Sequence, residues 1–157
     1  MRKIMKDTLI ELATKDPKIV FLTGDLGVEY NDYRKIFPDR YFNFGVCEQS
    51  MISLSSGMAL EGFRPYVYSI TPFLLERPFE QIKVDLDFQK VNVKLIGFAD
   101  YHGMGPTHAE LDWRTIGKVF KNTQFYFPSS AYEVRKAMYD SYEYHGPAII
   151  SLKKIKS

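Results

Sequence analysis

A glutamate stands where an apolar run meets a helical pattern in this 157-residue sequence. The stretch Tyr41–Gly62 begins with aromatic and apolar residues, breaks at Gly45 and continues as a helix that starts near Glu48. A strand that enters a helix through a glycine presents side chains at the carboxyl edge of an α/β sheet, where such folds bind ligands. A carboxyl group can accept or donate a proton, so Glu48 is the leading candidate for acid–base chemistry.

Polar and glycine-containing turns follow other apolar runs of the chain too. They are Asp25 after Ile19–Leu22, the segment Ile70–Arg77 after Arg64–Ser69, and the segment Tyr101–His108 after Val91–Phe98. The carboxyl ends of parallel strands meet at one edge of a sheet, so we expect these turns to surround a single ligand site.

Cys47 directly precedes Glu48 and supports a rival hypothesis, a cysteine hydrolase. The segment Gly45–Gln49 resembles the nucleophile elbow G-x-nucleophile-x-G, a thiolate at a helix N-terminus would be activated, and His108 could act as its base. Gln49 replaces the second glycine of the elbow and would crowd the turn, which makes this the weaker hypothesis. A single cysteine excludes an internal disulfide and metal clusters of the cysteine type.

Helical and strand patterns alternate along the whole chain, and they must position these residues. We expect strands at 19–22, 41–44, 64–70, 91–98, 124–127 and 148–152, and helices at 2–14, from Glu48 to Gly62, from Thr71 to about Asp87 with a kink at Pro78, at 112–119, and from Ser130 to about Tyr144. Short connections between apolar strands predict an α/β fold in which a mostly parallel sheet lies between two helical layers. We expect one domain over residues 1–157.

The helix after Glu48 is rich in serine, glycine and alanine, so another element could approach it closely. Met51, Ile52, Leu54 and Met58 are expected to share its buried stripe. Aromatic residues make up 15% of the chain, with 12 Phe and 11 Tyr, which is more large apolar surface than a monomer of this size readily hides. Both features favour a partner that covers part of the surface.

The charge balance gives no electrostatic footprint for nucleic acid. Lys and Arg number 21 against 19 Asp and Glu. The sequence has neither the apolar segment of a signal peptide nor an apolar run long enough to span a membrane, so we expect a cytoplasmic protein.

Several short motifs occur in a set order and spacing. They are GDLG at Gly24–Gly27, FP-x-R at Phe37–Arg40, N-x-G-x-x-EQ at Asn43–Gln49, RP-x-E-Q-I at Arg77–Ile82 and GPTH at Gly105–His108. Together they resemble the pyrimidine-binding (PYR) domain of the transketolase family of thiamine-diphosphate enzymes, which includes the deoxyxylulose-phosphate synthases. The resemblance covers nearly all of the chain and implies the thiamine-diphosphate-binding fold of the PYR type.

The resemblance implies a role for Glu48 and its neighbours in cofactor binding. Glu48 matches the glutamate that hydrogen-bonds the pyrimidine N1′, where the shared proton helps the 4′-imino tautomer form and remove the proton from thiazolium C2. Phe73 matches an aromatic residue that packs on the pyrimidine ring, and Ile70 stands where other members often carry a second aromatic residue. Arg77 matches an arginine near the same pocket.

His108 matches a histidine of the substrate channel, a catalytic and substrate-binding position. His102 and Tyr101 lie on the same loop and would assist it in binding substrate. Asp25 and Gln49 are assigned to the subunit contact.

The family also implies a partner chain. Its diphosphate and Mg²⁺ are held by a separate domain with a GDG...N motif, which we do not find in this sequence, and we expect neither that domain nor the carboxyl-terminal transketolase domain here. This chain would contribute no metal ligand. We expect a partner subunit with the GDG...N motif, assembled as a hetero-tetramer, or self-association of this chain as a dimer.

The resulting hypothesis is the pyrimidine-binding subunit of a split, thiamine-diphosphate-dependent, transketolase-like enzyme. It would transfer a ketol or acyl unit from a ketose or 2-oxo acid donor to an aldehyde. Two alternatives within the family stay open: a subunit of a two-chain 2-oxo acid decarboxylase, and a non-catalytic scaffold of a thiamine enzyme. The presence of Glu48 argues against the scaffold, because a binding-only domain has no need of that carboxyl group.

Overall fold

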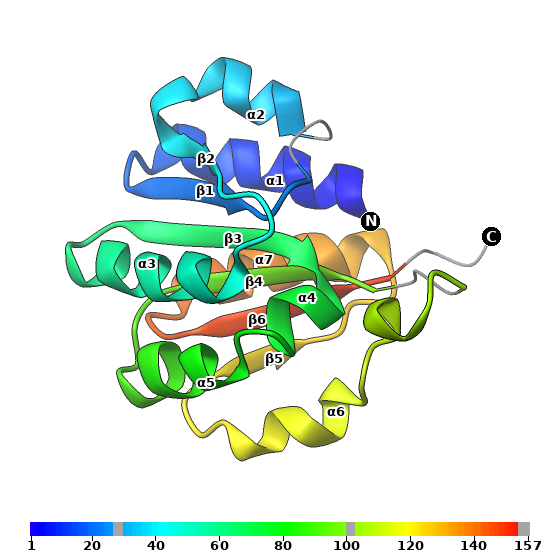
Figure 1. The fold of residues 1–157 in the computed structure, drawn as a ribbon. Helices are drawn as coiled ribbons and strands as arrows, with labels where there is room; N and C mark the ends of the chain where they lie inside the picture. Colours follow the sequence, from blue (N-terminus) through cyan, green and yellow to red (C-terminus); the bar gives the residue numbers. More distant parts are fainter. Residues whose placement is uncertain (27–29, 100–102, 154–157) are drawn as a thin grey trace.

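A computed structural model describes residues 1–26, 30–99 and 103–153 of the chain. Its described residues form a six-stranded sheet in the order β2-β1-β3-β4-β6-β5, in which every neighbouring pair is parallel (Figure 1). The strands are β1 (Ile19–Thr23), β2 (Tyr41–Asn43), β3 (Arg64–Ile70), β4 (Lys94–Phe98), β5 (Gln124–Tyr126) and β6 (Ala148–Leu152). The α/β class and the parallel sheet predicted from the alternating pattern are therefore confirmed.

Helices cover both faces of the sheet. In the view of Figure 1, α3, α4 and α5 lie in front of the strands, and α1 and α7 lie behind them. The α-helices are α1 (Arg2–Lys15), α2 (Asn31–Ile36), α3 (Glu48–Leu60), α4 (Thr71–Leu75), α5 (Phe79–Gln81), α6 (Trp113–Ile116) and α7 (Ala131–Glu143). Short 3₁₀ turns are η2 (Pro38–Arg40), η4 (Pro106–His108) and η5 (Gly117–Val119), and η3 (Ile82–Phe88) is a π-helix.

The core is divided in two by the sheet, because successive side chains of a strand point to opposite faces. Phe21 and Tyr66 pack with α1, α2 and α7 in one cluster. Leu22 and Val67 pack with α3, α4 and η3 in the other. The strands are apolar on both faces for this reason, as expected of a parallel sheet between helical layers.

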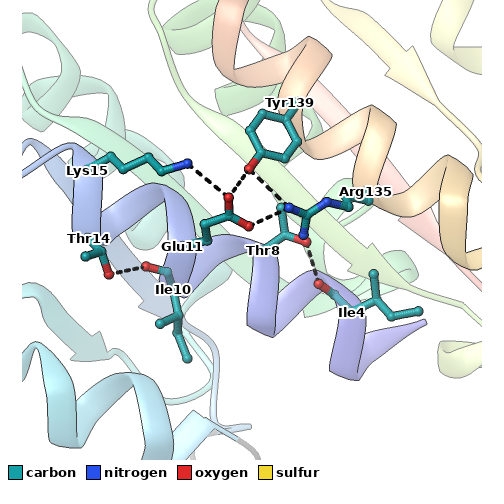
Figure 2. Close-up of polar contacts among 8 residues, drawn as sticks. All are labelled: Ile4, Thr8, Ile10, Glu11, Thr14, Lys15, Arg135 and Tyr139. Carbon is teal, nitrogen blue, oxygen red and sulfur yellow. Dashed lines mark hydrogen bonds and ion pairs between the residues drawn. The ribbon is translucent and has the colours of Figure 1, made fainter.

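A charged network joins α1 to α7 (Figure 2). The Glu11 carboxylate accepts hydrogen bonds from Tyr139 Oη at 2.5 Å, Arg135 Nη2 at 2.6 Å and Lys15 Nζ at 3.0 Å. These bonds, above all the one from Tyr139, lower the pKa of Glu11 to about 2. The network therefore links two helices that lie far apart in the sequence.

The structure corrects parts of the sequence-based expectation. On α3, Met51 and Ile52 are buried as predicted, but Leu54 is 47% exposed, and the predicted stripe is wrong at that position. The strand predicted from Val91 begins at Lys94. The helix predicted from Thr71 does break near Pro78, and it continues as two short segments of different geometry. Within the described ranges, no helix combines the length and the apolar character needed to cross a membrane.

Candidate active site

The turns that follow β1, β2, β3 and β4 gather at one edge of the sheet. The connection after β1 leads to α2, which packs on the same side as α1, whereas the connection after β3 leads directly to α4 on the opposite side. Adjacent strands whose connections leave to opposite faces form a topological switch point, the place where α/β sheets bind ligands. The expected convergence of these turns is confirmed for their described residues.

Asn43 holds two of these turns together. Its side-chain Oδ1 accepts the backbone N–H of Asp25 at 3.2 Å and the backbone N–H of Gly45 at 3.0 Å. Asp25 has a φ of 53° and Gly45 a φ of 66°, so both turns use the left-handed region of backbone conformation. Asn43 thus fixes the turn from which α3 starts, and with it the position of Glu48.

Glu48 is the first residue of α3, and only 4% of its surface is exposed. It lines a hollow of about 470 Å³ at the edge of the sheet, together with Val46, Cys47, Gln49, Ser50 and Arg77. A carboxyl group that is buried but borders a hollow is available to a ligand and shielded from bulk water. This combination suits a group that exchanges a proton with a bound molecule.

Arg77 lines the same hollow and contacts Glu48 directly. Its Nη1 is 3.1 Å from both carboxylate oxygens of Glu48, and its guanidinium carbon is 3.5 Å from the centre of the Phe73 ring. The Phe73 ring in turn meets the His108 ring edge to face, with 4.9 Å between their centres. Glu48, Arg77, Phe73 and His108 therefore form one continuous row of contacts.

Most of the predicted site residues meet at this edge, but not all of them. Ile70 is 3% exposed and pairs with Phe98 inside the sheet, and it is not among the residues that line the hollow. Asp25 and Gln49 are both exposed, and Gln49 lines the hollow; their assignment to a subunit contact stays a prediction. The predicted substrate residues Tyr101 and His102 lie outside the described residues.

The backbone at Cys47 does not support the elbow of a cysteine hydrolase. Cys47 is exposed and caps α3 with a φ of −137°, an unstrained value. Among the described residues, the non-glycine positions with positive φ are Asp25 and Lys90. His108, the suggested base, packs against Phe73 and lies 3.1 Å from the Thr107 hydroxyl through Nδ1.

No cluster of three or more His, Cys, Asp or Glu side chains that could hold a metal ion occurs in the part of the chain that the structure describes. The chemistry of this edge is that of a buried carboxyl group joined, through the Arg77 guanidinium, to an aromatic ring. Such a pair suits a flat heterocycle that stacks on the ring and hydrogen-bonds the carboxyl group.

Sequence reasoning placed Arg77 in the pocket but missed its direct contact with Glu48, and it missed the role of Asn43. It also gave no role to Arg40 of the FP-x-R motif. Arg40 Nη1 donates to the backbone oxygens of Ala13 at 3.0 Å and Asp16 at 3.2 Å, so this motif closes the carboxyl end of α1. The set order of the motifs along the sequence was the one signal that could have suggested that Arg77 and Arg40 make contacts with distant residues.

Comparison with known proteins gives a consistent result. The sequence model of the family described as "Transketolase, pyrimidine binding domain" matches residues 1–157. A subunit of the apulose-4-phosphate transketolase of Phocaeicola vulgatus is 32% identical over 154 residues, which are 95% of this chain and 49% of that protein. The 1-deoxy-D-xylulose-5-phosphate synthase of Desulfitobacterium hafniense is 31% identical over 94% of this chain and 24% of its own length.

A solved structure described as "Split gene transketolase, inactive beta4 tetramer" superposes with a TM-score of 0.88 at 29% identity. The superposition covers 98% of this chain and 50% of the other. This chain therefore spans about half the length of the split-transketolase relatives that it matches.

Proposed function

The chain belongs to the family of transketolase pyrimidine-binding domains, and we propose that it is the pyrimidine-binding part of a split, thiamine-diphosphate-dependent enzyme. The single observation that carries this proposal is the position of Glu48, which is 4% exposed at the start of α3 and borders a hollow that Arg77, the neighbour of Phe73, also lines. A buried carboxyl group at a ligand-binding edge is costly unless it has a partner or a function.

The residues at this edge fit the aminopyrimidine end of thiamine diphosphate. The Glu48 carboxylate already accepts hydrogen bonds from a flat, nitrogen-bearing group, the Arg77 guanidinium, which stacks on Phe73. An aminopyrimidine is also flat and carries ring and amino nitrogens. Glu48 and Phe73 are therefore the residues that would hold it.

The chemistry that bound thiamine diphosphate supplies is a carbon nucleophile that carries a ketol or acyl unit between substrates. In this proposal Glu48 holds a proton at the pyrimidine ring nitrogen and shields it from water, because its side chain is buried. Phe73 orients the ring by stacking. His108 lies on the other side of Phe73 and donates to hydroxyl or carbonyl oxygens of the substrate.

The described residues include no metal cluster, so a second chain is proposed to bind the diphosphate and its Mg²⁺. Support comes from the relative in Phocaeicola vulgatus, which is named as a transketolase subunit and hence as one of several chains. The name of that relative also supports a sugar phosphate as substrate. The donor and the aldehyde acceptor are part of our proposal. Transfer of a ketol unit between them is the reaction that we propose for the assembled enzyme.

The proposal is tested by isolating the chain with the proteins that accompany it and reconstituting the pair. We expect Glu48→Gln to slow hydrogen–deuterium exchange at C2 of thiamine diphosphate by about 10²–10⁴-fold, the usual contribution of acid–base catalysis. Exchange is followed by proton NMR on the reconstituted pair. Cys47→Ala, a change one residue away, is the matched control and should leave exchange at the wild-type rate.

Other outcomes would favour the alternatives. A Cys47→Ala variant that loses activity while Glu48→Gln keeps it would support a cysteine hydrolase. A partner that turns over fully without this chain would support a non-catalytic scaffold. Release of carbon dioxide from a 2-oxo acid without an aldehyde acceptor would support the two-chain decarboxylase.

A further inference from the structure

Arg77 is placed to obstruct the proposed cofactor site. The residue lies in the short link between α4 and α5, and 37% of its side chain is exposed, against 4% for the Glu48 side chain that it contacts. One guanidinium thus reaches in from the surface and covers both the buried carboxylate and the face of the Phe73 ring. The guanidinium therefore contacts Glu48 and Phe73 at the same time, and the hollow opens beside it.

The contacts of Arg77 imitate those of an aminopyrimidine. A guanidinium is planar, stacks on aromatic faces and presents N–H donors in its plane. Arg77 places its guanidinium carbon over the Phe73 ring and its Nη1 on Glu48, and the proposed function assigns these same two residues to the cofactor ring. A ring and a guanidinium cannot occupy one place at the same time.

We infer that Arg77 is a placeholder, which occupies the pyrimidine position in the chain without cofactor and must swing out before the ring can dock. The inference rests on the proposed function of Glu48 and Phe73. Displacement of Arg77 then adds a free-energy cost to cofactor binding, because only the fraction of molecules with Arg77 displaced is competent to bind.

The geometry allows the guanidinium to leave. Both contacts to Glu48 come from a single nitrogen, Nη1, so the pair lacks the two parallel hydrogen bonds that make arginine–carboxylate pairs strong. The backbone at the start of the link is held in place, since the Glu76 N–H donates to the backbone oxygen of Pro72 at 2.9 Å. Release therefore needs a rotation of the exposed Arg77 side chain and no movement of α4.

The test is the affinity of the reconstituted pair for thiamine diphosphate with Mg²⁺, measured by calorimetry together with the association rate by stopped-flow fluorescence. Arg77→Leu removes the placeholder and leaves Glu48 without its cation. We expect an apparent Kd about three- to tenfold lower and a faster association. Weaker binding, or no change, would overturn the inference, because Arg77 would then hold the cofactor or have no part in its binding.

Arg114→Leu is the matched control, since Arg114 also stacks on an aromatic ring, that of Phe127 at 4.4 Å, but does not line the Glu48 hollow. It should bind the cofactor as the wild type does. If Arg77→Leu does not fold, Arg77→Lys keeps the charge but not the flat stacking group, and should change affinity and rate in the same direction by a smaller factor.

NMR of the arginine side chains gives a second measurement that does not depend on catalysis. In the wild-type pair, the Arg77 side-chain N–H signals should exchange slowly with water without cofactor and rapidly once the site is saturated. A pair that does not bind thiamine diphosphate at all would instead refute the proposed function. Binding that leaves the Arg77 signals protected would refute the placeholder alone.

Discussion

At the scale of single residues, Lys94 is a charged side chain whose burial was not expected from the sequence. It begins β4 and is 2% exposed, and its Nζ donates to the backbone oxygens of Tyr144 at 2.7 Å and Gly146 at 2.6 Å. Burial lowers the pKa of Lys94 to about 7. A neutral amine still has two hydrogens, enough for both carbonyl groups at the end of α7.

The lowered pKa of Lys94 predicts how stability changes with pH. The unfolded chain binds a proton at this lysine up to about pH 10.4, whereas the folded chain loses it near pH 7, so stability should rise with pH across that window. The slope contributed by Lys94 is up to about 1.4 kcal/mol per pH unit. Lys94→Met should remove this contribution, measured as urea-denaturation free energies at pH 7 and pH 9.

Lys94→Met also leaves two carbonyl groups without donors, so its stability should be lower at both pH values. Lys118→Met, at an exposed position, is the control and should keep the wild-type slope. Equal slopes for the wild type and Lys94→Met would contradict the prediction.

Residue types at the site were readable from the sequence, and their contacts were not. Glu48, Phe73 and His108 were expected at one edge, and the structure brings them together there. The pair of Glu48 with Arg77 spans 29 positions and depends on the angle at which α4 leaves the sheet. Leu54 was expected in the core because periodicity alone cannot say how wide the buried face of a helix is.

At the scale of elements, β4 and the start of α4 approach so closely that only glycine fits between them. A Cβ atom built on Gly97 would lie 2.5 Å from Thr71 Oγ1 and 3.0 Å from Thr71 Cα. Since α4 carries Phe73, the missing side chain at Gly97 sets the position of the aromatic ring of the site.

Gly97→Ala should therefore push α4 away from the sheet. We expect a loss of roughly 1–3 kcal/mol in the free energy of unfolding, as for other overpacked cores, together with weaker thiamine-diphosphate binding by the reconstituted pair. Gly57→Ala on α3 is the control, because a Cβ there meets nothing within 4 Å. It should stabilise the chain by about 0.5–1 kcal/mol, since alanine favours a helix over glycine.

Denaturant unfolding and calorimetric binding measure both effects. A Gly97→Ala chain as stable as the wild type would show that α4 is free to move without cost. That result would also remove the reason to attribute the position of Phe73 to this close contact.

The boundaries of helices and strands were predicted best where turn-forming or capping residues flank them. The predicted strands Arg64–Ile70 and Ala148–Leu152 agree with the structure at both ends, and Gly62, where the helix from Glu48 was predicted to end, follows α3 in a left-handed conformation. The start of the helix predicted from Ser130 also agrees with the structure, since Ser130 caps α7 and its Oγ accepts the N–H of Glu133. The π-helix η3 could not be predicted, because helical periodicity does not reveal the extra residue per turn.

At the scale of the whole molecule, the network around Glu11 connects the first and last helices, α1 and α7 (Figure 2). The pKa of Glu11 in the folded chain is about 2, and its hydrogen bond from Tyr139 is the largest cause. Its contribution to stability is therefore full above the unfolded pKa of about 4.3 and is lost as the pH falls toward 2.

Glu11→Gln should lower stability at pH 7 and make no difference near pH 2. The effect should shrink in high salt, because the groups are exposed and their charges are screened. Urea denaturation of the two chains at several pH and salt values measures it. Glu61→Gln, at the exposed C-cap of α3, is the control, and a loss at pH 7 that is insensitive to salt would contradict the ionic explanation.

The architecture of the molecule followed from the alternation of strands and helices, because parallel strands with short crossovers have few ways to pack. The strand order did not follow. Strands that are apolar on both faces have no sequence pattern that determines which strand pairs with which. The order β2-β1-β3-β4-β6-β5 is therefore set by the packing of the whole molecule.

The position of Cys47 has a practical consequence. It is the only cysteine of the sequence and it is exposed, one residue before Glu48. A maleimide dye would attach at this one point and so report on whatever approaches the hollow. In air-oxidised preparations, the same thiol would join two chains face to face through their hollows, and the inactivity of that cross-linked species would be an artefact that a reducing agent reverses.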